Sequence, residues 1–216
     1  MSRKWIGPLA IAISALVTAL IYGRLPDQVP THWGFSGEID DWGPRFPYAF
    51  LGPLMGAALW VLLPVLRRVD PRRRNYERFD ETFWLLLNVI TLGMLYLHGL
   101  TLAVALGYGV NVTRAMLFGV GVLFAALGNY LPRLRSNWWI GIRTPWTLES
   151  EEVWRRTHRL GGRTFVIGGV LCMAAALLPL RAAPWVAMAG LAFGAITPLV
   201  YSYILWRRER EQAARS

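Results

Sequence analysis

The sequence predicts an all-α integral membrane protein with six transmembrane helices and with both termini in the cytoplasm. Six long apolar segments run along a chain of 216 residues, 55% of which are hydrophobic. Each segment approaches the ~20 residues that a helix needs to cross the hydrocarbon core of a bilayer. Among the Asp, Glu, Lys, Arg and His residues of the chain, only His98 falls inside these segments. A soluble domain of this length has no use for six such segments, so residues 1–216 are expected to form a single membrane domain.

The spans follow one another with short connections, apart from an outer loop at 24–47 and an inner loop at 132–162. The six predicted spans are Trp5–Tyr22, Tyr48–Leu66, Thr82–Gly107, Ala115–Leu131, Thr164–Leu180 and Ala183–Trp206.

Basic residues are sorted between the connecting segments. Of the 23 Lys and Arg residues, 19 lie before the first span, in 67–78, in 133–163 or beyond residue 206. The positive-inside rule therefore predicts that these segments face the cytoplasm and that the loop 24–47 faces outward. The net charge of +10 is carried on the predicted inner side, which favours attraction to anionic lipids and not direct nucleic-acid binding.

The outer loop is rich in proline, glycine and aromatic residues, which predicts turns and a cap on the outer mouth of the bundle. In the third span, Asn88, Thr91 and His98 share one helical face, and His98 lies about 24 Å beyond Thr82 at 1.5 Å per residue. His98 is therefore expected near the outer surface, beneath the loop. The residues expected to line one ligand-binding pocket there are His32, Trp33, Asp40, Trp42 and His98.

Other roles for the two histidines remain open. His32 can instead be structural and hydrogen-bond within its loop, and His98 can be a neutral side chain bonded to a neighbouring helix. A zinc or catalytic site is less favoured, because metal sites combine several His or Cys ligands and each of these segments holds one histidine. We therefore expect no metal, no cofactor and no catalytic residues.

The inner loop contains a segment, Ser150–Leu160, with an amphipathic pattern. Thr147 or Ser150 can cap its first turn. Trp154 shares an apolar face with Leu160, and three arginines occupy the other face. This pattern predicts an interfacial helix between spans four and five that lies along the membrane and ends at the Gly161–Gly162 pair.

Two stretches of sequence resemble the SdpI-type bacteriocin-immunity family. Residues 25–32 read LPDQVPTH and are followed by Gly37, while 128–132 read GNYLP and 137–147 read NWWIGIRTPWT. The inner motif residues are Asn129, Asn137, Gly141, Arg143, Thr144, Pro145, Trp146, Trp154 and His158. The resemblance implies a multi-pass protein of the bacterial cytoplasmic membrane. It implies protection against a secreted, membrane-active toxin peptide at the outer face, and signalling through a winged-helix repressor held at the inner face.

The inner motif also allows structural roles. Asn137 can satisfy backbone groups at a helix end, Arg143 can pair with Glu149 or with a lipid phosphate, and His158 can pack beside Trp154. A small transporter or exporter of a lipid-like or peptide substrate is the alternative function. Transporters usually carry Asp, Glu, Lys or Arg within their spans, and this chain carries none there. The HExxH and GxSxG motifs of common hydrolases are also absent from the sequence.

Overall fold

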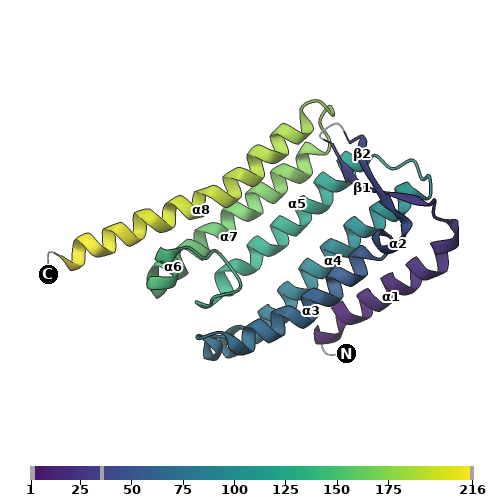
Figure 1. The fold of residues 1–216 in the computed structure, drawn as a ribbon. Coiled ribbons are helices and arrows are strands. Elements are labelled where there is room, and N and C mark those ends of the chain that lie inside the picture. Colours follow the sequence, from purple (N-terminus) through teal and green to yellow (C-terminus); the bar gives the residue numbers. More distant parts are fainter. Residues whose placement is uncertain (1–2, 35–36, 215–216) are drawn as a thin grey trace.

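The computed structural model describes residues 3–34 and 37–214, which form a bundle of long helices with a β-hairpin at one end (Figure 1). The long helices are α1 (Ile6–Ile21), α3 (Leu51–Val69), α4 (Asp80–Ala105), α5 (Val112–Tyr130), α7 (Glu151–Ala175) and α8 (Ala183–Ala213). The short elements are α2 (Arg45–Tyr48), α6 (Pro145–Glu149), β1 (Gln28–Trp33), β2 (Ile39–Pro44) and 3₁₀ turns at Arg3–Trp5, Tyr22–Arg24, Arg73–Phe79 and Leu131–Arg133.

Five of the six long helices lie where spans were predicted. In the described part of the chain, five of them are long and apolar enough to cross a membrane, namely those containing α1, α3, α4, α5 and α8. The sixth, α7, is 25 residues long, but its first half carries charged side chains. The protein is therefore a multi-pass membrane protein, and only the second half of α7 corresponds to the predicted fifth span.

The outer loop, for which the sequence predicted turns and a cap, forms an antiparallel hairpin. Gln28 of β1 pairs with Pro44 of β2, and Trp33 pairs with Ile39. Arg45 holds the base of the hairpin, because its guanidinium donates to the carbonyl oxygens of Tyr22 and Leu25 at 3.3 and 3.0 Å. Turn-forming prolines and glycines in both strands hid the alternation by which strands are recognised. Phe35, one of the loop's aromatic residues, lies outside the described residues.

The prediction that Ser150–Leu160 forms a separate interfacial helix is wrong. Residues 150–160 are the N-terminal cap and first turns of α7, which continues through Gly161 and Gly162. Ser150 does cap this helix, accepting a hydrogen bond from Val153 N–H at 3.2 Å. Trp154 is only 1% exposed and donates its indole N–H to the Leu134 carbonyl oxygen at 3.0 Å. It therefore faces the protein interior and not acyl chains.

Two pairs of adjacent glycines let α7 lie directly against both neighbouring helices. Toward α5, a Cβ on Gly162 would lie 2.8 Å from the Gly128 carbonyl oxygen, and one on Gly169 would lie 2.5 Å from that of Gly121. Toward α8, a Cβ on Gly168 would lie 2.5 Å from the Gly190 carbonyl oxygen. Glycine is a helix breaker in water, but in membranes small residues permit close helix contact. This role explains why the glycine pair does not end the helix.

The polar face of α4 is satisfied by two neighbouring helices. Asn88 Oδ1 accepts from the Gly7 N–H of α1 at 2.9 Å, and Trp60 of α3 donates to Thr91 Oγ1 at 3.0 Å. His98 Nε2 lies 3.1 Å from Thr18 Oγ1 of α1. Buried polar groups in hydrocarbon need such partners. His98 thus adopts the structural alternative, bonded to a neighbouring helix.

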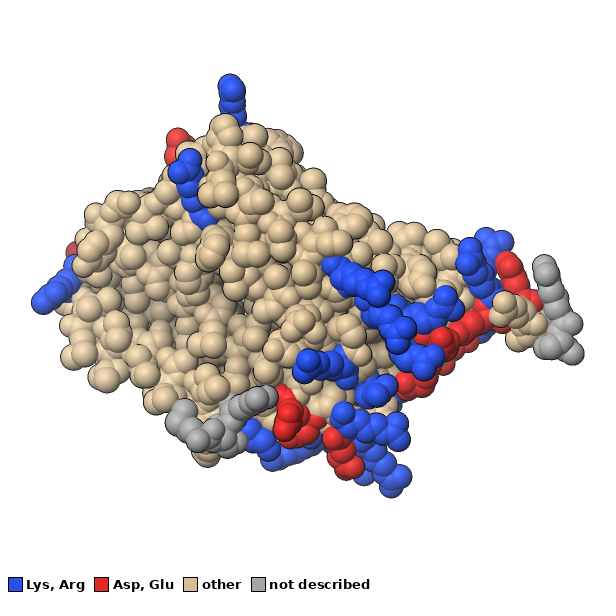
Figure 2. All heavy atoms as spheres, turned by 180° about the vertical axis from the view of Figure 1, so that it is seen from behind, with Lys and Arg blue, Asp and Glu red and all other residues tan. Residues whose placement is uncertain are grey.

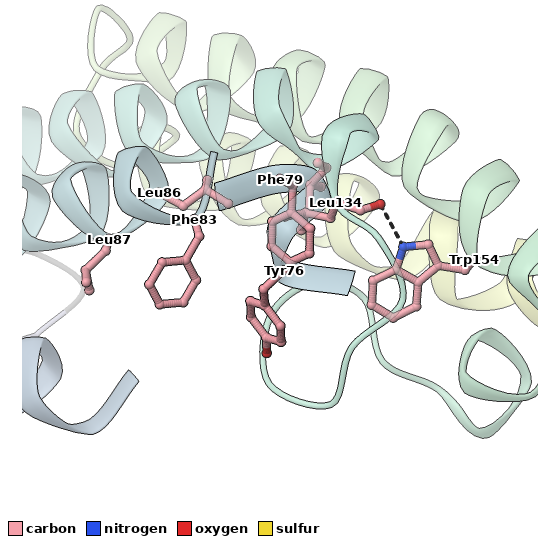
Figure 3. Packing of buried hydrophobic residues seen from close by; sticks show 8 residues of the cluster. Tyr76, Phe79, Phe83, Leu86, Leu87, Leu134 and Trp154 are labelled. Carbon is pink, nitrogen blue, oxygen red and sulfur yellow. Dashed lines mark hydrogen bonds between the residues drawn. The ribbon is translucent and has the colours of Figure 1, made fainter. Parts of the chain in front are cut away.

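The two ends of the molecule differ in their content of basic side chains. The arginine-rich end comprises the start of α1, residues 70–79 and 132–150, and the C-terminal part of α8, and Figure 2 shows basic side chains gathered there. The hairpin end lies opposite (Figure 1). At the arginine-rich end, an apolar cluster joins α4 to the start of α7 (Figure 3). Its buried members are Tyr76, Phe79, Phe83, Leu86, Leu87, Leu131, Leu134 and Trp154.

The glycine contacts yield a first prediction. Gly169→Ala should destabilise the protein by about 2 kcal/mol or more, because its methyl group would force α5 and α7 apart. Gly99→Ala is the matched control, since Gly99 is also helical and a Cβ there would have no neighbour within 4 Å. The control should be neutral or stabilising by up to about 1 kcal/mol. Thermal unfolding in detergent measures both, and equal melting temperatures for the two variants would contradict the packing role.

Candidate ligand-binding site

The hairpin covers a groove between α5 and α8, with a cavity of about 690 Å³. Its hairpin residues are His32, Trp33, Gly34, Gly37 and Asp40, and the helices contribute Val112, Thr113, Met116, Leu117, Phe124, Pro184, Ala187, Met188, Leu191, Ala192 and Ala195. The helical walls are almost wholly apolar, whereas the hairpin supplies the polar groups. We call this cavity the hairpin groove.

The polar mouth of the hairpin groove is built from three side chains of the hairpin. His32 Nδ1 lies 2.6 Å from Asp40 Oδ1, and both side chains are largely exposed, at 68% and 49%. An exposed pair of this kind contributes little to stability. The indole nitrogen of Trp33 is buried and has no hydrogen-bond partner among the described residues. The mouth therefore offers an unused donor beside an imidazole–carboxylate pair.

Gly37 seats the hairpin on the first turn of α5. Its φ of +84° is in the left-handed region, and a Cβ there would collide with Thr113 Oγ1. The start of α5 is itself fixed, because Asn111 Oδ1 accepts from Arg114 N–H at 3.0 Å. The groove mouth is thus held by backbone geometry as well as by side chains.

The expected single pocket divides into two. His98 lines a second cavity of about 260 Å³, to which Pro30 and Thr31 also contribute. The pairing of β1 is irregular between Pro30 and Trp33, and the residues before His32 line this second cavity, whereas His32 and Trp33 line the hairpin groove. Trp42 is 48% exposed and lines neither cavity. His32, Trp33 and Asp40 therefore share a site, but His98 and Trp42 do not join it.

The inner motif forms a compact loop around Asn137, which is fully buried. Its Oδ1 accepts from Trp139 and Ile140 N–H at 2.9 and 2.7 Å, and its amide donates to the carbonyl oxygens of Arg135 and Ile140. Asn137 therefore organises a loop, and not the helix end that the sequence suggested.

Asp70 ties this loop to the first half of the bundle and was not singled out in the sequence. The carboxylate is 1% exposed and accepts from Tyr76 O–H and Trp138 N–H, both at 2.9 Å. The Tyr76 hydroxyl also lies 3.1 Å from Asn137 Oδ1. The one available signal was an acidic residue within a segment otherwise rich in arginine.

The remaining residues of the motif are mainly structural. Gly141 has a φ of +112°, and a Cβ there would meet the His158 ring. His158 stacks on Trp154 at 4.1 Å between centroids. Thr144 caps α6, which begins at Pro145.

Of the two partners that the sequence allowed for Arg143, Glu149 is not the one it contacts. Arg143 instead donates to the Trp138 carbonyl oxygen at 2.6 Å. Glu149 accepts from Trp206 Nε1 and Arg210, both at 2.7 Å, and these bonds lower the pKa of Glu149. Trp146 packs against Tyr203 and Trp206 of α8. Asn129 is exposed in a groove beside α7.

Comparison with known proteins finds sequence similarity to an immunity protein and to two sequence profiles. The sequence profile of the SdpI/YfhL protein family matches residues 133–202, and that of a domain of unknown function (DUF1648) matches residues 9–57. The immunity protein SdpI of Bacillus subtilis (strain 168) is 27% identical over 174 residues, which cover 79% of this chain and 80% of that protein. The chain is thus similar to an SdpI-type immunity protein over most of its length. Among solved structures, none matches significantly.

The SdpI/YfhL profile covers most of the inner motif, from Asn137 to His158, and the α8 wall of the hairpin groove, but not the hairpin or the α5 wall. Residues 9–57 include β1 and β2, so the second profile covers the groove mouth. Within the described part of the chain, no three His, Cys, Asp or Glu side chains are placed to hold a metal ion.

His158 gives a prediction on pH. Burial lowers the pKa of His158 to about 4, whereas an unfolded histidine titrates near 6.5. The unfolded state therefore binds more protons between these values, so stability is fully present above about pH 6.5 and falls as pH drops toward 4. The loss reaches about 3 kcal/mol.

Thermal unfolding in detergent between pH 7.5 and pH 4.5 measures this loss. His158→Gln can still accept from the Ile142 N–H, which lies 3.0 Å from His158 Nε2, and it should flatten the pH dependence. His32→Gln, a change at an exposed site, should leave the dependence as in the wild type. Parallel curves for the wild type and His158→Gln would exclude His158 as the source.

Proposed function

We propose that the protein is an immunity protein of the bacterial cytoplasmic membrane that binds a secreted, hydrophobic toxin peptide in the hairpin groove. The observation that carries the proposal is the groove itself, which combines apolar helical walls with a polar mouth. Apolar side chains of a peptide would pack against Met116, Met188 and Leu191. Methionine suits such a surface because its flexible side chain adapts to irregular partners. Carbonyl groups of the peptide would accept a hydrogen bond from the indole N–H of Trp33, which has no partner among the described residues.

The proposed orientation places the hairpin end outside the cell and the arginine-rich end in the cytoplasm, in agreement with the positive-inside rule. Single cysteines at Glu38 and Glu77 test it in a Cys172→Ser background, because both glutamates are exposed and belong to opposite ends. An impermeant maleimide should label position 38 in intact cells and position 77 only after lysis. Labelling of position 77 in intact cells would reverse the orientation.

We also propose that the arginine-rich end holds a small winged-helix repressor, as the family resemblance implies. The loop 135–148 presents Trp138 and Trp139 at 47% and 36% exposure, beside the guanidinium of Arg143. Exposed tryptophan and arginine are the side chains most often found at the centres of protein interfaces. Asn137 and Asp70 hold this loop rigid from within.

Filling the groove should abolish protection. Ala192→Phe places a ring in the groove, whereas Ala189→Phe places the same ring on an exposed part of α8 that does not line it. Cells of the source organism that lack the gene should die in culture supernatant from toxin-producing kin. The wild-type gene and Ala189→Phe should restore survival, and Ala192→Phe at equal abundance should not.

Replacement of groove and non-groove residues refines the test. Trp33→Ala should weaken protection at least tenfold, whereas Trp42→Ala should leave it intact, since Trp42 lies outside the groove. Survival with every groove variant would remove the groove from the mechanism. Accumulation of the peptide inside cells without the gene, with no change in sensitivity, would instead favour the exporter alternative.

A further inference from the structure

A second groove, distinct from the hairpin groove and from the cavity lined by His98, lies at the arginine-rich end. It runs between the end of α5 and the middle of α7. It encloses about 480 Å³, and its lining includes Asn129, Pro132, Arg159, Arg163, Val166 and Ile167. The close approach of Gly128 and Gly162 brings the two helices together here, since a Cβ on either would lie less than 3 Å from the other's carbonyl oxygen. No acidic residue lines this groove.

Two guanidinium groups in the groove have no counter-charge. Arg159 and Arg163 are exposed and one helical turn apart on α7, and within residues 3–34 and 37–214 neither forms an ion pair or a hydrogen bond. Other arginines of this end do pair, as Arg67 does with Asp80 and Arg155 with Glu152. Residues one turn apart on a helix have Cβ atoms about 6 Å apart. Two such side chains can therefore converge on a single anion.

The polarity of α7 changes within one turn at this groove. Arg163 is followed by Thr164, where the apolar half of the helix begins, and Ile167 is 49% exposed on the next turn. A bilayer changes in the same way from phosphate to acyl chain over a short depth. The groove thus matches the head and the first chain segment of a phospholipid, and a soluble anion would leave its apolar half uncovered.

We propose that this groove binds the phosphate of an anionic phospholipid from the leaflet at the arginine-rich end. Arg159 and Arg163 donate to the phosphate oxygens, with the bidentate geometry that arginine offers to phosphate. The amide of Asn129 donates to the glycerol ester region, and Val166 and Ile167 contact an acyl chain. The site is separate from the hairpin groove and does not depend on any toxin.

Native mass spectrometry of the detergent-purified protein with added phosphatidylglycerol tests the site. The wild type should retain bound lipid, and Arg159→Gln/Arg163→Gln should bind it at least about tenfold more weakly. Arg73→Gln/Arg74→Gln is the matched control, since it removes two exposed arginines of the same end that line none of the described cavities. The control should bind like the wild type. If the double variant does not accumulate, Arg163→Gln alone should show a partial loss.

Further measurements distinguish a phospholipid from free inorganic phosphate as the ligand of this groove. Phosphatidylcholine should bind more weakly than phosphatidylglycerol, and millimolar inorganic phosphate should not displace the lipid. Displacement by inorganic phosphate would mean a phosphate site without a lipid and would overturn the proposal. Equal losses in the groove variant and the control would also overturn it, because they would show general attraction of charge to the membrane and no site.

Discussion

The direct contact of α7 with α5 and α8 is the constraint on which the rest of the structure depends. Lipid chains are as apolar as leucine, so helices in a membrane gain from packing shape more than from excluding water. The glycine pairs of α7 remove the side chains that would hold the three backbones apart. Both proposed sites rest on this unit: the hairpin groove lies between α5 and α8, and the second groove lies where Gly128 meets Gly162.

The first half of the bundle is joined to this unit by polar contacts that are buried. Asp70 and Asn137 both contact the Tyr76 hydroxyl, and Trp138 donates its backbone N–H to Asp70. Removing one partner of a buried hydrogen bond lowers stability, because no water is present to replace it. The main role of the inner motif is therefore structural, because it fixes the loop 135–148 between the two halves of the helix bundle. The exposed side chains around it are the ones available for recognition.

Much of the architecture could be predicted because it follows from hydropathy and helical period. The positions of five of the spans, the separation of basic residues and the shared face of Asn88, Thr91 and His98 are of this kind. Three features could not be predicted, for physical reasons. The Gly161–Gly162 pair predicts the end of a helix unless the positions of the neighbouring helices are known. Strands containing Pro30 and Gly43 lack a clear alternation. The division of the outer pocket falls at the irregularity of β1 between Pro30 and Trp33, and this requires knowing that β1 is a paired strand.

The two ends of the molecule are connected by the helices that line the hairpin groove. A helix of 31 residues such as α8 extends about 46 Å, beyond the roughly 30 Å of hydrocarbon, so it reaches from the groove past the arginine-rich surface. There it contacts α6 through Glu149, which bonds to Trp206 and Arg210. Such exposed pairs contribute little to stability, whereas the network of Asp70 and Asn137 is buried. A shift of α8 would also act on α6 through the Trp146 ring and through the buried contact of Thr144 with Ser202 at 3.3 Å, and it would reach the loop that presents Trp138 and Arg143 through α6.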